Sequence, residues 1–170
     1  MAKEIWRPGN MLYPVPAVLV SCGDGKGTDN IITVAWAGTV CSDPAMVSVS
    51  LRPERWSYHL IKESGEFVIN LTTEALARAA DEAGVRSGRD TDKWELLGLT
   101  REKASAVSAP MIAESPVSIE CRVKEVLPLG SHHMFLGEVA AVSVDPAYLD
   151  EKGRLDFGKM KLITYAHGGY

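Results

Sequence analysis

Residues 30–71 read NIITVAWAGTVCSDPAMVSVSLRPERWSYHLIKESGEFVINL, and this stretch decides the fold. Within it, Met46 to Arg52 alternates strictly between apolar and polar residues. A period of two places Val47, Val49 and Leu51 on the core face of a strand and the intervening serines on a polar face. The segments 30–37 and 67–71 are short, apolar and rich in β-branched residues, which predicts further strands on either side.

Two short helices are expected among these strands. The first runs from Ser57 to Ser64, with Ser57 as N-cap and Gly65 as terminator. The second runs from about Glu74 to Ala83, begins after Thr72 or Thr73 and stops at Gly84. Its inward face carries Leu76, Ala79, Ala80 and Ala83.

The flanking sequence adds strands in antiparallel order. Residues 15–22 form a strand that the glycine-rich stretch GDGKGTD joins to the next as a hairpin. Two long strands, 117–127 and 134–144, are joined by PLGSHH, while 85–115 is an ordered excursion with a helical patch at 92–97. Without regular alternation of strands and helices, this pattern favours one mainly β domain, residues 1–170, built as a closed or partly closed barrel.

Composition narrows the possible partners and compartment. The net charge is −4 and the pI about 5.6, so the protein has no positive field that would attract nucleic acid or anionic lipid. Three widely spaced cysteines, Cys22, Cys41 and Cys121, indicate reduced thiols rather than a disulfide framework. The N-terminal MAKEIWRPGN has no signal-peptide core, and no apolar run approaches membrane-spanning length. We expect a cytoplasmic protein with no nucleic-acid or membrane partner.

An anion site is predicted where the strand 46–52 meets the first helix. Ser48, Ser50 and Arg52 run directly into PERWS, so hydroxyls, two guanidiniums and free helix amides converge within ten residues. The helix dipole and the first-turn amides favour a phosphate, and an arginine can donate hydrogen bonds to two of the phosphate oxygens. The alternative is that Arg52 and Arg55 pair with Glu54 or Glu63 on a solvated face.

The stretch NIITVAWAGTV carries small residues at Ala35, Ala37 and Gly38, beside which a flat ring could lie against the backbone. The same residues could instead relieve crowding in a barrel core. Trp36 and Trp56 also allow two interpretations, since aromatic residues near strands serve as core or dimer contacts as well as stacking partners.

Two histidines and a glycine-rich loop invite other interpretations. His132 and His133 lie at the start of a strand, where an imidazole could contact a substrate. Adjacent residues of a strand point to opposite faces, which disfavours the binding of one metal ion by the two histidines. We expect no metal. The loop GDGKGT fits neither a P-loop nor a dinucleotide fingerprint, so any nicotinamide is held outside a Rossmann crevice.

Nearly the whole chain resembles the flavin reductase-like family of FMN-binding split β-barrels, and more closely its flavoredoxin-like branch. The matching stretches are MLYPVPAVLVS, the segment from Asp29 to Leu71, GVRSGRDTDKWELLGLT and GSHHMFLGEV. The resemblance implies a Greek-key split barrel that forms a homodimer, with the flavin near the subunit boundary.

The resemblance also implies site residues. The isoalloxazine and ribityl chain of FMN would follow Thr33, Val34, Ala35 and Trp36, and the phosphate would meet Ser50, Leu51, Arg52 and Ser57. A loop reaching toward the flavin would bring Ser87, Asp92 and Lys93. His132 matches a histidine that faces the nicotinamide, while Ser131 replaces a common acid.

The implied activity is hydride transfer from NADH or NADPH to FMN, and then electron transfer to an acceptor. A carrier that keeps FMN and relays electrons to a redox partner protein, without turning over nicotinamide, is the alternative. A third possibility is a structural dimer that has lost the flavin. The sequence does not separate the first two.

Overall fold

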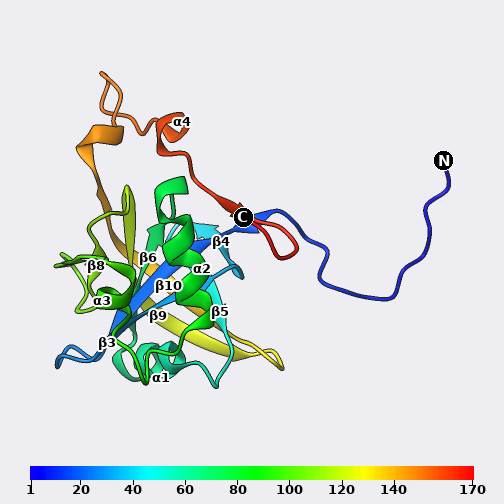
Figure 1. Ribbon diagram of the computed structural model, residues 1–170, viewed down its shortest axis with the longest axis horizontal. Coiled ribbons are helices and arrows are strands. Elements are labelled where there is room, and N and C mark those ends of the chain that lie inside the picture. The colour runs from blue at the N-terminus through cyan, green and yellow to red at the C-terminus, as the bar shows by residue number, and fades with distance from the viewer.

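The computed structural model describes all 170 residues and is dominated by one antiparallel sheet (Figure 1). Seven strands follow the order β3-β2-β6-β9-β10-β5-β4. Their bounds are β2 Val18–Gly23, β3 Asp29–Val34, β4 Ala37–Ser42, β5 Ala45–Leu51, β6 Glu66–Leu71, β9 Val117–Pro128 and β10 His133–Val144. Two small pairs complete the sheets: β1 (Val15–Pro16) with β11 (Thr164–Tyr165), and β7 (Arg101–Glu102) with β8 (Met111–Ile112).

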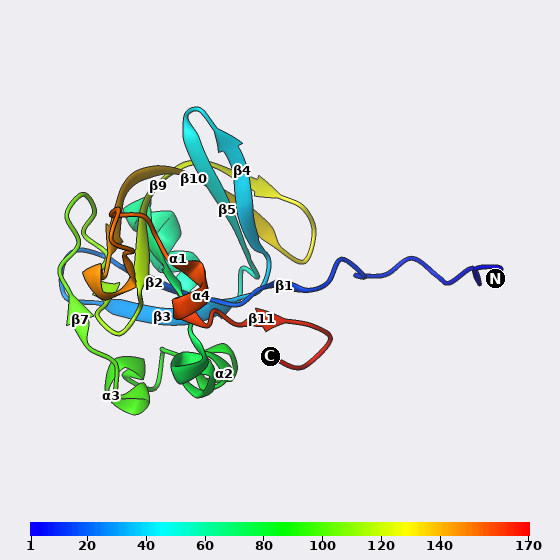
Figure 2. The ribbon, with the colours of Figure 1, turned by 90° about the horizontal axis from the view of Figure 1, so that it is seen from above.

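The two edges of the main sheet are consecutive along the chain. Strands β3 and β4 stand at opposite ends of the strand order, yet only Ala35 and Trp36 separate them. The sheet must therefore curl until its edges meet, which produces the partly closed barrel expected from the sequence (Figure 2). The sequence did not reveal that the apolar run 30–40 contains two strands, because its turn lacks the usual Gly, Pro or Asn signals.

The barrel interior holds the largest hydrophobic cluster. Side chains from several strands meet there, including the fully buried Val20, Val49, Phe67 and Phe135. Helix α1 (Trp56–Ser64) contributes Leu60 and Ile61 to the same cluster. A second cluster lies outside β2 and β3, where α2 (Ala77–Val85) and α3 (Lys93–Leu97) cover the sheet. Strand β2 is consequently buried along its whole length.

Three details of the predicted helices were wrong. Arg55, not Ser57, is the N-cap of α1, so Ser57 lies inside the first turn. A 3₁₀ turn, η1 (Glu74–Leu76), precedes α2, and that helix continues through Gly84 to Val85. Gly84 therefore does not end the helix, and a Cβ at this position would contact Thr33 at 3.5 Å. The Asp92 cap of α3 and the αL glycine Gly65 after α1 match the usual signals.

The polar side of β9 is partly buried. Ser118 and Glu120 lie on it with 4% and 0% exposure, and the loop between β7 and β8 folds over Glu120. The Glu120 carboxylate accepts hydrogen bonds from the Ser105 amide and hydroxyl, which anchors this loop to the sheet. A carboxylate so placed satisfies amides that the loop would otherwise bury unpaired.

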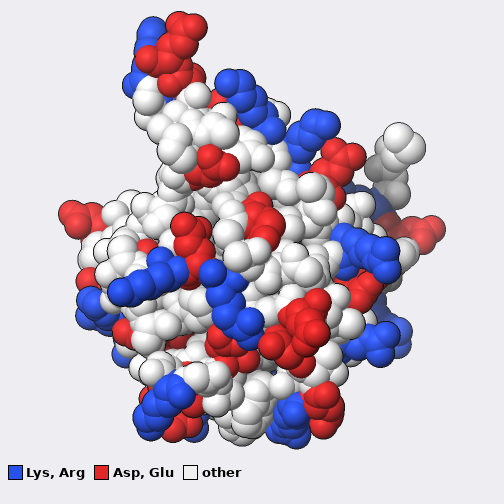
Figure 3. All heavy atoms as spheres, turned by 60° about the vertical axis from the view of Figure 1, so that its left-hand side comes forward, with Lys and Arg blue, Asp and Glu red and all other residues white.

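The two ends of the chain differ in packing. Residues 1–12 are exposed and extend away from the body as an N-terminal arm (Figures 1 and 2). After β10, the chain passes through η2 (Pro146–Tyr148) and α4 (Phe157–Met160) before β11. No helix is both long and apolar enough to cross a bilayer. Acidic and basic side chains intermingle on the face drawn in Figure 3.

The barrel interior tolerates no side chain at Gly137 in β10. A Cβ there would lie 2.6 Å from Phe67 Cζ and 3.1 Å from Cys121 Cβ, both fully buried residues. We expect Gly137→Ala to lower the free energy of unfolding by about 1–3 kcal/mol, measured by urea denaturation. Gly169→Ala, where a Cβ would meet only the Ala166 carbonyl oxygen at 3.9 Å, is the control and should change it little. Equal effects at both glycines would contradict this account of the core.

Candidate functional site

Three adjoining cavities follow the seam where the curled sheet meets itself. The basic cavity, of about 240 Å³, is lined by Asn30, Ile32, Arg52, Glu54, Arg55, Trp56, Arg86, Ser87, Gly88 and Lys93. The strand groove, of about 160 Å³, is lined by Ile32, Thr33, Val34, Ala35, Trp36, Ser50, Leu51, Arg52, Arg55, Gly84 and His132. The arm cavity, of about 740 Å³, continues from the groove toward the N-terminal arm. Arg52 lines all three, so they form one continuous site.

Positive charge is concentrated in the basic cavity. Its walls include four cations, Arg52, Arg55, Arg86 and Lys93, against a single carboxylate, Glu54. Arg52 lies 3.7 Å from Glu54 through Nη1 and Oε1, so the surface pairing considered from the sequence does exist. Because both partners are more than half exposed, this pair holds Arg52 only weakly. The cavity keeps an excess of positive charge in a chain of net charge −4.

Helix α1 directs its N-terminus into the same region. Nine residues long, it begins at Trp56, which lines the basic cavity. The amides of Trp56 and Ser57 have no hydrogen-bond acceptor within the protein, whereas the Tyr58 amide donates to the Arg55 carbonyl. Free first-turn amides and the positive end of the helix dipole both favour an anion here.

Lys93 is the most constrained cation of the site. It is 3% exposed, and its Nζ donates to the carbonyls of Ile31 and Ala83, each at 2.8 Å. An ammonium group has three donors, so one remains for a ligand in the cavity. Burial, and secondly the positive charge of Arg55, lower the pKa of Lys93 to about 8. An anion bound nearby would relieve both effects.

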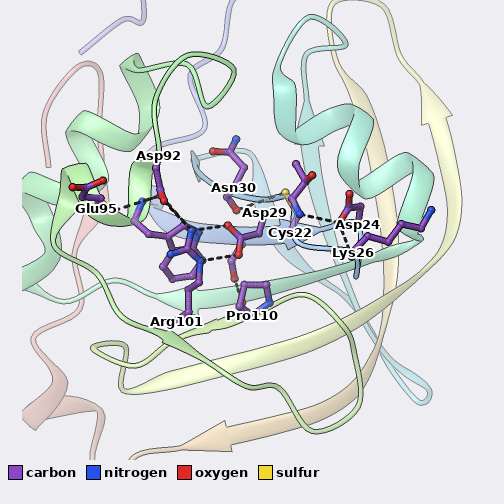
Figure 4. A network of polar contacts seen from close by, with 12 residues as sticks. Cys22, Asp24, Lys26, Asp29, Asn30, Asp92, Glu95, Arg101 and Pro110 are labelled. Carbon is purple, nitrogen blue, oxygen red and sulfur yellow. Dashed lines mark hydrogen bonds and ion pairs between the residues drawn. The ribbon is translucent and has the colours of Figure 1, made fainter.

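Lys93 is positioned by an ionic network on the outside of the sheet (Figure 4). The Asp92 carboxylate accepts from the amide of Trp94, which starts α3 at Lys93. Arg101 binds Asp29 through Nε and Nη2, at 2.8 and 3.0 Å, and also reaches Asp92 at 3.2 Å. The network ties the start of α3 to the start of β3, next to Asn30 of the basic cavity.

The loop carrying Ser87 and Gly88 packs directly on Asn30. A Cβ at Gly88 would overlap the Asn30 amide, so only glycine fits this close approach. Asn30 in turn donates through Nδ2 to the Ser57 hydroxyl at 2.9 Å, and both residues are buried. Loop, strand and helix are therefore locked together around the basic cavity.

The strand groove combines backbone and small side chains. Thr33 donates its hydroxyl to the Ala80 carbonyl of α2, and residues 33–36 all line the groove. The Trp36 carbonyl accepts from the Ser50 amide at 2.8 Å and so closes the seam. The ring of Trp36 lies near Tyr13, with centroids 6.2 Å apart. The groove has room for a flat group beside a main-chain edge.

The two neighbouring histidines face different partners. His132 lines the strand groove and pairs through Nδ1 with the Ser131 hydroxyl at 3.0 Å. Burial, and then the positive charge of Arg52, lower the pKa of His132, which favours the neutral imidazole. His133 instead pairs through Nδ1 with the Tyr58 hydroxyl at 2.9 Å.

Most residues singled out from the sequence converge on this site. Eight of them line the strand groove: Thr33, Val34, Ala35, Trp36, Ser50, Leu51, Arg52 and His132. Ser87 and Lys93 line the basic cavity. Ser57 and Asp92 line neither; the Ser57 hydroxyl is engaged by Asn30 inside the protein, and Asp92 caps α3 and pairs with Arg101.

Sequence reasoning missed four residues that line the basic cavity: Asn30, Ile32, Arg86 and Gly88. Asn30 looked like the polar start of a strand, and Arg86 and Gly88 belong to a loop whose placement depends on distant contacts. The only local signal was Gly88 itself, between Ser87 and Arg89. A glycine at this position does not show which distant residue it packs against.

Comparison with known proteins agrees with this geometry. A sequence model described as a flavin reductase-like domain matches residues 10–170. The flavoredoxin of Desulfovibrio vulgaris (Miyazaki F) superposes with a TM-score of 0.89 at 35% identity, over 97% of this chain and 88% of that one. The flavoredoxin of Methanosarcina acetivorans gives 0.86 at 27% identity, over 99% and 94%.

A relative identified by sequence is an NADH-dependent FMN reductase of Streptomyces nodosus subsp. asukaensis. It is 33% identical over 129 residues, which cover 75% of this chain and 68% of that protein. The proteins similar to this chain therefore include two flavoredoxins and an NADH-dependent FMN reductase.

Proposed function

The chain belongs to the flavin reductase-like family, and we propose that it is an FMN-dependent oxidoreductase that accepts hydride from NADH or NADPH and passes electrons to an acceptor. One observation carries this proposal: a cavity with four cations adjoins a narrow groove lined by residues 33–36, and the two share Ile32, Arg52 and Arg55. FMN has the same layout, since it joins a dianionic phosphate to a flat ring system through a flexible chain.

The residues present fit such a cofactor. Arg52, the third donor of Lys93 and the free amides of Trp56 and Ser57 would hold the phosphate. The strand groove would hold the ring, with main-chain groups of 34–36 along its edge. Bound FMN supplies the two-electron hydride chemistry, while the protein binds, orients and shields it.

His132 would act on the reacting side of the groove. Its lowered pKa keeps the imidazole neutral, so it contributes a hydrogen bond and a shaped wall rather than a fixed positive charge. NADH and NADPH are the proposed donors, which the FMN reductase relative supports. The sequence contains no Rossmann fingerprint, so the nicotinamide nucleotide would bind transiently.

A second candidate is an electron carrier that keeps FMN without turning over nicotinamide. The strong structural similarity to two flavoredoxins favours it, and its partner would be a redox protein. Both candidates use the same FMN site and differ in what approaches the exposed ring.

We also propose that the protein is a cytoplasmic homodimer. Strand β4 is an edge of the main sheet, and Gly38, Thr39 and Val40 on it are exposed. An exposed edge strand is a ready site for pairing with another chain. The arm adds exposed apolar residues, Ile5 and Trp6, that a second copy would cover. The free cysteines support a reducing compartment.

The direct test is an absorption spectrum followed by a nicotinamide oxidation assay. Purified protein, incubated with FMN and freed of excess, should absorb near about 450 nm, as protein-bound flavins do. It should then oxidise NADH or NADPH when an acceptor is supplied. Bound flavin with negligible oxidation would support the carrier, and failure to retain any flavin would overturn both candidates.

Removing the Arg52 guanidinium tests the phosphate end. We expect Arg52→Ala to weaken FMN binding by about 1.5–3 kcal/mol, or roughly 10- to 150-fold, the worth of a charge-assisted hydrogen bond. Equilibrium titration followed by flavin fluorescence measures this. Arg78→Ala, which removes a 92% exposed arginine from α2, is the control and should leave the affinity unchanged. Unaltered FMN affinity in Arg52→Ala would remove Arg52 from the site.

The pKa of Lys93 predicts a pH dependence of FMN affinity. Lys93 carries its charge below a pKa of about 8 and loses it as the pH rises. Bound phosphate stabilises the charged form, so the affinity should be steady from pH 7 to about 8 and then fall by up to about tenfold per pH unit. Titrations between pH 7 and 9.5 measure this.

Two controls isolate Lys93. Riboflavin, which lacks the phosphate, should bind without this fall, and Lys93→Met should bind FMN more weakly with a flat profile. Because Met leaves the Ile31 and Ala83 carbonyls without a donor, circular dichroism should first establish that the variant folds. An identical fall in Lys93→Met would assign the titration to another group.

A further inference from the structure

The last residues of the chain, 164–170, fold back on the barrel as a small C-terminal hairpin. Strand β11 pairs with β1 in antiparallel order, with Tyr165 opposite Val15 (Figure 1). Beyond β11, Ala166 and Gly169 exchange two backbone hydrogen bonds, of 2.9 and 3.1 Å. Main-chain contacts therefore give the C-terminal hairpin a defined place beside β1.

The turn of the C-terminal hairpin carries the imidazole of His167. Both central residues of the turn, His167 and Gly168, have positive φ, at 51° and 96°. Positive φ at both positions is the geometry of a type I′ turn, and histidine is one of the few residues other than glycine that are enriched in this region. The His167 ring stacks on Tyr13, with ring centroids 5.5 Å apart and planes at 12°. The turn thus places an aromatic ring against the residue that precedes β1 by two positions.

Tyr13 lies between the C-terminal hairpin and the strand groove. Besides His167, the Tyr165 ring meets it edge-on, with centroids 6.3 Å apart and planes at 61°. The indole of Trp36 meets it with centroids 6.2 Å apart and planes at 44°. Aromatic pairs in this range of distances and tilts are stabilising. Tyr13 therefore connects two rings of the hairpin to one ring of the groove.

The Trp36 side chain depends on this support because the barrel core does not hold it. Trp36 lines the strand groove, yet it belongs to none of the hydrophobic clusters of the protein. Its carbonyl is bonded to the Ser50 amide, which fixes the backbone at the seam but not the rotamer of the indole. Tyr13 is the aromatic ring that packs against that indole. The position of one wall of the groove therefore depends on the opposite end of the chain.

We propose that Tyr13 is a positioning residue for the flavin ring, acting through Trp36, and that the C-terminal hairpin holds Tyr13 in place through His167. This inference rests on the proposed function, because the groove is assigned there to the flavin ring. Neither Tyr13 nor His167 lines the groove, so both act through the indole. Their contribution is to the ring end of FMN, away from the phosphate.

Three substitutions separate the ring contacts from the fold. Tyr13→Leu removes the ring that packs on Trp36, and Tyr13→Phe keeps it. His167→Asn removes the imidazole but keeps a residue suited to a type I′ turn. Phe157→Leu, which changes a 60% exposed ring of α4 outside this group of aromatic residues, is the matched control. Circular dichroism first establishes that each variant folds, and the surface variant His167→Asn carries the test if Tyr13→Leu does not.

Fluorine NMR of protein labelled with 5-fluorotryptophan observes the indole directly and needs no flavin. The chain has four tryptophans, and Trp36→Phe identifies the resonance of Trp36. We expect this resonance to shift in Tyr13→Leu and in His167→Asn, but not in Phe157→Leu. The buried Trp94 is the internal reference, and its resonance should not move. A Trp36 resonance that stays in place in both variants would overturn the proposal.

Titration with FMN and with riboflavin then measures the effect on the ring. We expect Tyr13→Leu and His167→Asn to weaken both ligands by the same factor, about two- to tenfold, which corresponds to the loss of one aromatic contact. Tyr13→Phe and Phe157→Leu should bind both ligands as the wild type does. A loss confined to FMN would place the effect at the phosphate and contradict the proposal, as would unchanged affinity for both ligands.

The two measurements also separate this proposal from the proposed function. Wild-type protein that binds neither flavin would overturn the proposed function, while the fluorine spectra would still decide whether the C-terminal hairpin holds Trp36. Wild-type protein that binds FMN, with variants that bind it equally well, would leave the proposed function standing and overturn the role of Tyr13.

Discussion

The structure depends on one topological constraint: the two edge strands of the sheet are consecutive in the chain. Ala35 and Trp36 are all that joins β3 to β4, so the sheet cannot lie open. Its curling brings the end of β5 against the end of β3, with the Trp36 carbonyl bonded to the Ser50 amide across the seam. The site lies along this seam because closure is incomplete there. The same turn therefore determines both the barrel and the groove.

The basic cavity has an electrostatic cost that folding alone does not recover. Lys93 is buried beside Arg55, and two carbonyls satisfy only part of its hydrogen-bonding capacity. Burying like charges together is unfavourable unless an opposite charge or further hydrogen bonds compensate. The compensating contacts from Asp29, Asp92 and Arg101 lie outside the cavity and fix the position of α3, not the charge inside. An anion in the cavity would supply the missing opposite charge.

Local patterns in the sequence were sufficient to predict burial where a residue's environment depends on its immediate neighbours. The alternation of 46–52 placed Val47, Val49 and Leu51 in the core, and all three are less than 9% exposed. Patterns failed where distant segments decide: the turn at Ala35–Trp36 is imposed by the pairing of β4 with β5, and helix α2 continues past Gly84 because it packs on β3. Ser57 was a plausible cap, but Asn30, 27 residues away, engages its hydroxyl. Asn30, Arg86 and Gly88 became visible as site residues only once the chain had folded.

The three cavities lie in parts of the molecule that differ in how well they are packed. The basic cavity is built from a sheet, two helices and a loop locked on Asn30, whereas the arm cavity is bounded by the N-terminal arm and a strand connection at the surface. Binding energy from a phosphate far from the reacting ring can position that ring without favouring any one reactant. The choice of reactant would then belong to the exposed walls, where substitutions cost little stability. A reductase and a carrier built on this barrel would therefore differ at these exposed walls.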